Sequence, residues 1–307
     1  MNISYFEPLS RAFNRMKVAL FKPFDISKWF VMGFNAFLAG LLDGHGGGGN
    51  SSSRGGFNNI HLSDIVEAPQ HGWEWLIDHP GWFMLIAFLL VLGFMLFVIL
   101  TWLSSRGKFM FLDNVVTNRA EVKKPWAQYK TQGNSLFLWR LIFGFIIIAL
   151  FVVLVINFFY QAADIYRDSF SDSFPVLLLV KTILIGLFLM IIIGYIANFL
   201  DSFVIPIMYK HNLTINQAWS RFLHLFGQYP LYFLLYGIIT FILAIIAFII
   251  VIIAGLFTCC IGFIFLIIPY INAVVLLPIS FTFRTYSLEF LAQFGEEYTL
   301  IPKEESI

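Results

Sequence analysis

Three ionisable residues lie inside or at the edge of long apolar stretches, where a charge is costly and is often retained for function. Lys181 lies about 9 Å beyond the start of its stretch by helical rise, so it is a candidate for an intramembrane role. A lysine at this depth can also extend its ammonium group back to the lipid surface. Lys108 and Asp201 end two other apolar stretches and are 93 residues apart. We predict a structural ion pair between them.

The residue sets that usually support catalysis or cofactor binding are not found in the sequence. It has no Ser/His/Asp arrangement, no HExxH motif and no phosphate-binding glycine loop, since the glycines at 46–49 follow no strand and precede no helix. One polar loop contains four histidines whose spacing matches no metal-ligand motif: His45, His61, His71 and His79. We therefore expect a protein that is not an enzyme, with no catalytic residue, no cofactor and no metal.

The composition indicates the environment of the chain. Apolar residues make up 59% of the 307 residues and charged residues only 12%, against roughly 45–50% and 25% in ordinary globular proteins. Apolar runs near 20 residues recur, and each is long enough to cross a hydrocarbon layer of about 30 Å. In lipid such runs must be helices, because every backbone polar group needs an internal partner. The sequence predicts an all-α polytopic membrane protein.

Six apolar stretches are predicted to cross the membrane within a domain covering residues 1–290. They are residues 26–43, 80–102, 135–160, 175 to about 200, 231–257 and 263 to about 284. The helix of the second stretch is expected to continue out of the lipid to about residue 114. Residues 44–58 are rich in glycine and predict a flexible outer loop. Pro269 and Pro278 predict kinks in the last stretch. Residues 291–307 are expected to form a short cytoplasmic tail.

The distribution of lysine and arginine predicts the orientation of the spans. The amino-terminal segment, the second and fourth connections and the tail contain five, six, two and two of these residues. The opposite side contains only Arg54 and Arg167. Because basic loops stay in the cytoplasm, we expect a multi-pass protein of the inner or plasma membrane with both termini cytoplasmic.

Amphipathic segments precede three of the spans. In the first, Ala12, Phe13 and Met16 follow helical spacing opposite basic residues, which is typical of a helix lying in the membrane interface. A cap packed on other helices is the alternative. Thr214 and Gln217 have the spacing of a capping box at the start of the last such helix. The predicted interface-anchoring residues are Phe13, Trp73, Trp75, Trp126, Trp219 and Arg221.

An offset of 93 residues also relates longer parts of the chain. The aligned pairs are Trp126 with Trp219, Tyr129 with Phe222, Trp139 with Tyr232 and Gly144 with Gly237. This regularity predicts three parallel repeats, each an interfacial amphipathic helix followed by two spans, at about 8–114, 120–206 and 214–284. Parallel units differ from the inverted repeats of many transporters.

Three segments carry a resemblance to a known family: Lys108–Asn118, Pro125–Tyr129 and Asp201–Trp219. They resemble an uncharacterised bacterial and archaeal family of six-span membrane proteins, similar to the membrane domain associated with glycerophosphodiester phosphodiesterases. The resemblance implies a six-span fold and carries over no catalytic residue. A barrel-type catalytic domain needs about 250 residues, and no soluble stretch of the chain approaches that length.

These observations lead to alternative functions. We expect a non-enzymatic integral membrane protein that organises lipid at the cytoplasmic leaflet, with other membrane proteins or further copies of itself as partners. Its basic connections suit anionic lipid head groups better than nucleic acid. A carrier or channel for a small solute or lipid is the alternative, based on Lys181, Pro269 and Pro278. A membrane-embedded lipid enzyme would need an acid/base cluster that the sequence does not show.

Overall fold

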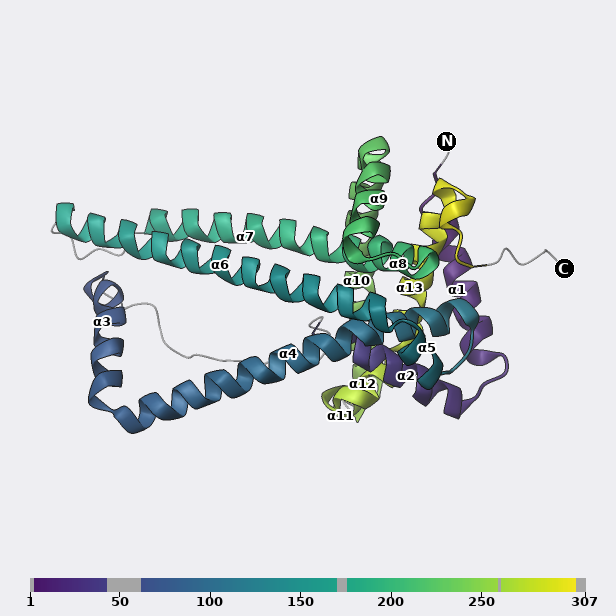
Figure 1. Ribbon diagram of the computed structural model, residues 1–307, viewed down its shortest axis with the longest axis horizontal. Coiled ribbons are helices and arrows are strands. Elements are labelled where there is room, and N and C mark those ends of the chain that lie inside the picture. Colours follow the sequence, from purple (N-terminus) through teal and green to yellow (C-terminus); the bar gives the residue numbers. More distant parts are fainter. Residues whose placement is uncertain (1–2, 43–61, 170–175, 259–260, 302–307) are drawn as a thin grey trace. The chain divides into compact units, whose positions relative to one another are not determined.

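The computed structural model describes residues 3–42, 62–169, 176–258 and 261–301. Over these residues the regular structure is helical, apart from one isolated β-bridge between Phe21 and Phe24 (Figure 1). The prediction of an all-α protein is confirmed. The internal contacts divide the chain into two units: unit 1 contains residues 1–48, 100–140 and 195–307, and unit 2 contains 49–99 and 141–194.

Unit 2 contains long apolar helices whose side chains are largely exposed. It is formed by α3 (Leu62–Asp78), the first half of α4 (Pro80–Thr117), most of α6 (Lys130–Ser169) and most of α7 (Val176–Phe199). Phe88, Leu90 and Val153 are each about 60% exposed or more. A soluble protein rarely exposes a contiguous apolar surface of this extent. Unit 2 therefore has the surface of a lipid-facing region.

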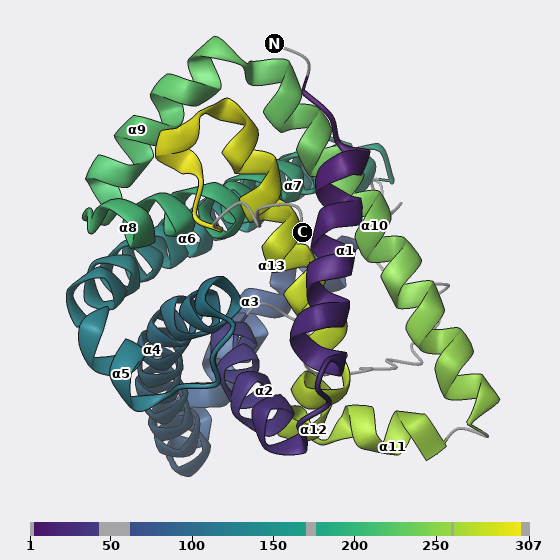
Figure 2. The ribbon, with the colours of Figure 1, turned by 90° about the vertical axis from the view of Figure 1, so that its right-hand side faces the viewer.

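Unit 1 is a packed assembly of helices with a buried core. Its aromatic centre is fully buried and includes Phe109, Phe203, Phe222, Phe233 and Phe290. Helices α1 and α13 lie side by side within it (Figure 2). Besides the parts of α4, α6 and α7, its α-helices are α1 (Phe6–Phe21), α2 (Ile26–Gly40), α5 (Lys123–Gln128), α8 (Ile205–His211), α9 (Ile215–Gln228), α10 (Pro230–Phe257), α11 (Ile261–Ile267), α12 (Pro269–Val275) and α13 (Leu277–Leu291).

The prediction of six spans is not confirmed. In the described part of the chain, four helical stretches are long and apolar enough to cross a membrane, and a bent helix pair raises this number to five at most. The four stretches are Pro80–Thr117, Lys130–Ile165, Val176–His211 and Pro230–Phe257. They correspond to the second, third, fourth and fifth predicted spans.

The first predicted span, residues 26–43, forms the short helix α2 of 15 residues. At 1.5 Å per residue this is about 22 Å, less than the thickness of the hydrocarbon layer. Two glycines explain how α2 packs instead against protein. A Cβ atom at Gly33 would lie 2.5 Å from Val274 of α12, and one at Gly107 of α4 would lie 2.6 Å from the backbone nitrogen of Ala39 in α2. Both contacts require the absence of a side chain.

The sixth predicted span is broken where its prolines predict kinks. α12 starts at Pro269 and α13 contains Pro278 in its first turn. The two helices are bent by 62°. Proline lacks the backbone N–H and its ring clashes with the preceding turn, so a continuous helix cannot form here.

The predicted tail starts with residues that belong to the core of unit 1. Leu291, Phe294, Tyr298 and Ile301 are all buried. Gln293 bonds the backbone of Ser4 in both directions, at 2.8 and 2.9 Å. Residues 291–301 therefore pack on the amino-terminal segment, which differs from the expected polar tail. The predicted outer loop 44–58 lies outside the described residues.

The amphipathic helices pack their apolar faces on protein. Ala12, Met16 and Leu20 of α1 are buried in the core of unit 1, as are Ala218 and Phe222 of α9. The predicted capping box at the start of α9 is confirmed. The apolar stripes of α1 and α9 thus pack on other helices. By sequence alone, the same stripes fit contact with lipid equally well.

Candidate functional site

A charged cluster in unit 1 is formed around a π-helical turn, Leu200–Val204, that ends α7. Pro206 explains the turn, because proline has no N–H to give and its ring would clash with the carbonyl of Ser202 in an α-helix. The N–H of Ile205 instead bonds the carbonyl of Leu200. The carbonyl of Asp201 is thereby left without its usual backbone donor.

Two basic side chains bond Asp201 from other helices. Lys108 of α4 lies with its Nζ atom 2.6 and 2.7 Å from the two carboxylate oxygens, and its side chain is only 3% exposed. Arg284 of α13 donates to the free backbone carbonyl of Asp201 at 2.5 Å. We call Lys108, Asp201 and Arg284 the Asp201 cluster. It joins α4, the end of α7 and α13, and it contains the predicted ion pair.

A second buried cation, Arg106, lies between two tryptophan rings. Its guanidinium carbon is 4.6 Å from the ring centre of Trp102 and 4.8 Å from that of Trp126. It also donates to Asn134 at 3.2 Å. Cation–π contacts of this kind are strongest when the cation is shielded from water. Trp126, a predicted interface anchor, therefore contacts a buried arginine of the same unit.

The other predicted anchors of unit 1 differ in their surroundings. Trp219 stacks on Trp139 with ring centres 5.7 Å apart, so its ring packs against protein. Arg221 forms an ion pair of 2.7 Å with Glu297. Phe13 is exposed on α1, and the Nζ atom of a lysine one turn later lies 4.4 Å from its ring centre.

In unit 2 the predicted residues lie on exposed surfaces. Trp73 is 62% and Trp75 is 47% exposed. Lys181 of α7 donates to Gln161 of α6 at 3.3 Å, and Gln161 donates to Asn157 one turn earlier. These three side chains form a polar chain between two apolar helices.

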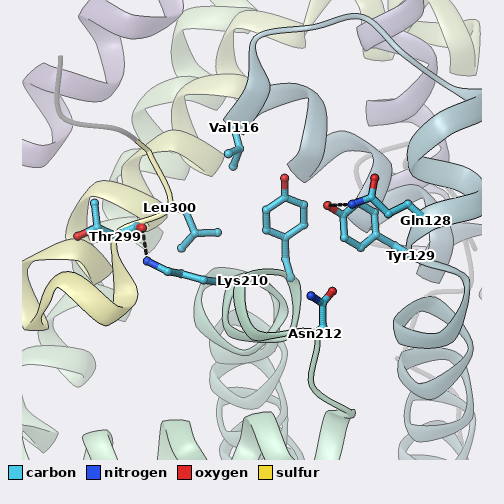
Figure 3. Close-up of a pocket in the computed structure, with 8 residues that line it drawn as sticks. Val116, Gln128, Tyr129, Lys210, Asn212, Thr299 and Leu300 are labelled. Carbon is cyan, nitrogen blue, oxygen red and sulfur yellow. Dashed lines mark hydrogen bonds between the residues drawn. The ribbon is translucent and has the colours of Figure 1, made fainter.

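A pocket of about 370 Å³ opens in unit 1 (Figure 3). We call it the Tyr209 pocket. Figure 3 shows Tyr129 and Gln128 on one side of the opening and Lys210 and Thr299 on the other, with Asn212 below. The lining residues are Val116, Gln128, Tyr129, Tyr209, Lys210, Asn212, Thr299 and Leu300. They come from the end of α4, α5 and its end, α8 and its end, and the carboxyl-terminal segment.

Hydrogen bonds fix the polar groups of this pocket. The hydroxyls of Tyr209 and Tyr129 both donate to the same oxygen of Asp113, at 2.8 and 3.3 Å. Lys210 donates to the carbonyls of Glu296, at 3.0 Å, and Thr299. Burial raises the pKa of Tyr129, so its hydroxyl keeps its proton well above neutral pH. The pocket thus contains fixed hydrogen-bond donors at its wall.

A comparison with protein-family models matches residues 3–276 to a family of unknown function, DUF7544. The match covers most of the chain. This chain belongs to DUF7544. Neither a curated protein nor a solved structure matches the chain. DUF7544 is a family of unknown function, and the long apolar helices are consistent with a membrane protein. The match shows no link to glycerophosphodiester phosphodiesterases.

Sequence reasoning did not find the Tyr209 pocket of this DUF7544 chain. Asn118 and Asn212 have positive φ angles of 55° and 53°, and each follows directly the helix end that contributes pocket residues. Asparagine adopts this left-handed conformation more readily than most residues. The two asparagines were the available signal for two similar helix ends, but nothing in the sequence places those ends beside each other.

Proposed function

We propose that the protein is a non-enzymatic membrane protein that organises anionic lipids, or partner proteins, at the cytoplasmic leaflet. The observation that carries this proposal is the exposed face of α1. Phe6, Phe13 and Phe21 are exposed on one side of the helix, together with Lys17. An aromatic stripe with a lysine is typical of helices that contact lipid head groups and the outer acyl region.

The contacts of α1 support a place at the membrane surface. Arg15 donates to the carbonyls of Val115 and Val116 at the end of α4, and Tyr5 donates to the carbonyl of Tyr232 at the start of α10. These are ends of candidate spans. In an alternating topology the end of α4 and the start of α10 belong to the same side of the membrane. The helix α1 then lies where the chain leaves the lipid.

The test compares lipid retention by two exposed surfaces. The triple variant Phe13→Ser, Lys17→Glu, Phe21→Ser removes the aromatic and basic groups of α1 without changing its buried face. Native mass spectrometry after gentle extraction is expected to show fewer bound phosphatidylglycerol molecules than in the unaltered protein. Leu223→Ser is the matched control, since Leu223 is 55% exposed on α9. Unchanged lipid retention in a stable triple variant would contradict the proposal.

A carrier is the second candidate, and the polar chain of unit 2 favours it. Lys181, Gln161 and Asn157 are linked by hydrogen bonds within segments that are otherwise apolar. Polar groups in such segments often mark a solute path. Solute movement into liposomes that is abolished by Lys181→Met would support a carrier. Equal movement in both proteins would exclude a role for this lysine.

A further inference from the structure

We propose that the Tyr209 pocket binds a phosphate group, held by Lys210 and Asn212, that belongs either to a lipid head group or to a soluble phosphate compound. The proposal does not depend on α1 contacting lipid. It is based on the donors that line the pocket, on how they are held, and on the basic residues of a connection that ends in two lining residues.

The first observation is the donor set of the pocket. Lys210 uses two of its three N–H groups for the carbonyls of Glu296 and Thr299, which fix its position and leave the third N–H available. Asn212 accepts a hydrogen bond of 3.3 Å from Gln132 through its Oδ1 atom. Its Nδ2 group has no acceptor among the described residues and points into the opening (Figure 3). Lys210 and Asn212 both line the pocket, and a fixed ammonium group and a free amide each suit an anionic oxygen.

The second observation is the state of the two tyrosines. Both hydroxyls donate to one oxygen of Asp113, but the bond from Tyr129 is the longer one, at 3.3 Å. A phosphate oxygen in the pocket offers the Tyr129 hydroxyl a second acceptor. The Asp113 carboxylate keeps its short bond from Tyr209 meanwhile. The pocket can therefore add a donor without leaving this carboxylate unsatisfied.

The third observation is the charge of the connection between two lining residues. The connection from Val116 to Gln128, both lining residues, carries exposed basic side chains. None of these forms an ion pair with a residue that the structure describes. Their positive charge attracts anions to this connection, which ends in two lining residues of the pocket. The exposed basic residues are Arg119, Lys123, Lys124 and, two positions after Gln128, Lys130.

The experiment uses the full chain in a neutral detergent with two probes. Inorganic phosphate is titrated at constant ionic strength against chloride, and binding is measured by calorimetry. Separately, phosphatidylglycerol is added back to delipidated protein, and bound lipid is counted by native mass spectrometry. Saturable binding in the first arm identifies a soluble phosphate, and saturable binding in the second arm alone identifies a lipid head group.

The variants remove one donor each and keep the fold. Asn212→Gly removes the amide group, and glycine tolerates the positive φ angle at this position. Tyr129→Phe removes the hydroxyl and keeps the aromatic ring. Each is expected to weaken binding about tenfold, since a hydrogen bond to a charged group is lost. Asn118→Gly is the matched control, because Asn118 has the same backbone conformation and does not line the pocket. Loss of binding in the control as well, binding that ignores both pocket variants, or no saturable binding in either arm would overturn the proposal.

Discussion

Helix α4 runs through both units, and its two halves differ in how much of their surface is buried. Between Trp82 and Ile99, in unit 2, most large apolar side chains are exposed. Beyond Leu100, in unit 1, polar and charged side chains are buried together with apolar ones. The buried polar residues of this half are Thr101, Ser104, Ser105, Arg106, Lys108 and Asn114.

The difference shows that hydropathy alone does not decide burial in this protein. A charged side chain is buried where it contacts specific partners. Lys108 forms an ion pair with Asp201, and Arg106 lies against two tryptophan rings. An apolar side chain stays exposed where the surrounding medium is itself apolar. The core of unit 1 thus follows the rules of a folded protein interior. Unit 2, like the largely exposed α10 of unit 1, follows those of a helix surface in lipid.

The largest effect is expected at the Asp201 cluster. Asp201→Ala leaves the buried ammonium group of Lys108 without its carboxylate, so the free energy of unfolding should fall by about 3 kcal/mol. Thermal unfolding in detergent measures this. A double-mutant cycle with Lys108→Met should show coupling between the two sites. Additive losses would mean that the ion pair does not stabilise unit 1.

Two glycines of α4 test the contrast within one helix. Gly107→Ala places a Cβ atom 2.6 Å from the backbone of α2, and the resulting separation of helices should cost about 2 kcal/mol. At Gly93 in unit 2 no atom lies within 4 Å of an added Cβ. Gly93→Ala should therefore stabilise the helix by about 0.5 kcal/mol or more. Equal melting temperatures for the two variants would contradict the division of α4.

Two tryptophans give a smaller difference of the same kind. Trp219→Ala removes a ring stacked on Trp139 in unit 1 and should cost about 2 kcal/mol of stability. Trp73→Ala, in unit 2, removes a largely exposed ring and should change thermal stability by less than about 0.5 kcal/mol. If the Trp219 variant were fully stable but lost its lipid or partner binding, this side chain would be a functional contact and not a packing one.

The smallest effect is expected from pH. Burial raises the pKa of Tyr129 in the folded state, so the unfolded chain loses this proton at lower pH than the folded chain. Stability from this group is complete below about pH 10, the unfolded value, and declines as the pH rises further. Tyr129→Phe should flatten this decline slightly in unfolding curves between about pH 9 and 11. A steeper decline of stability with pH in the variant would contradict this prediction.

Local sequence patterns were sufficient for the single helices. Apolar runs gave four of the spans, Pro269 and Pro278 marked the break before α13, and Thr214 with Gln217 marked the start of α9. The same patterns predicted six spans, and the described part of the chain has four, or five at most. Residues 26–43 are apolar, but their helix ends at Gly40. An apolar run shows that a segment favours nonpolar surroundings, and those surroundings can be either protein or lipid.

The Tyr209 pocket could not be predicted from the sequence, for a related reason. Its walls come from positions 116, 128–129, 209–212 and 299–300, which no local period connects. The segment at 299–300 was expected in a polar tail. A pocket depends on which helix ends meet, and that is set by long-range packing.

The sequence by itself determined that this chain is a helical membrane protein, and its 93-residue offset pointed to Lys108 and Asp201. Composition and helical period are properties of short segments, so they can be read directly from the sequence. Only the tertiary structure decided that the amphipathic faces of α1 and α9 pack on protein, that Arg284 takes the carbonyl freed at Asp201, and that a pocket forms beside Lys210. These features depend on the energies of contacts between distant residues, which no single segment encodes.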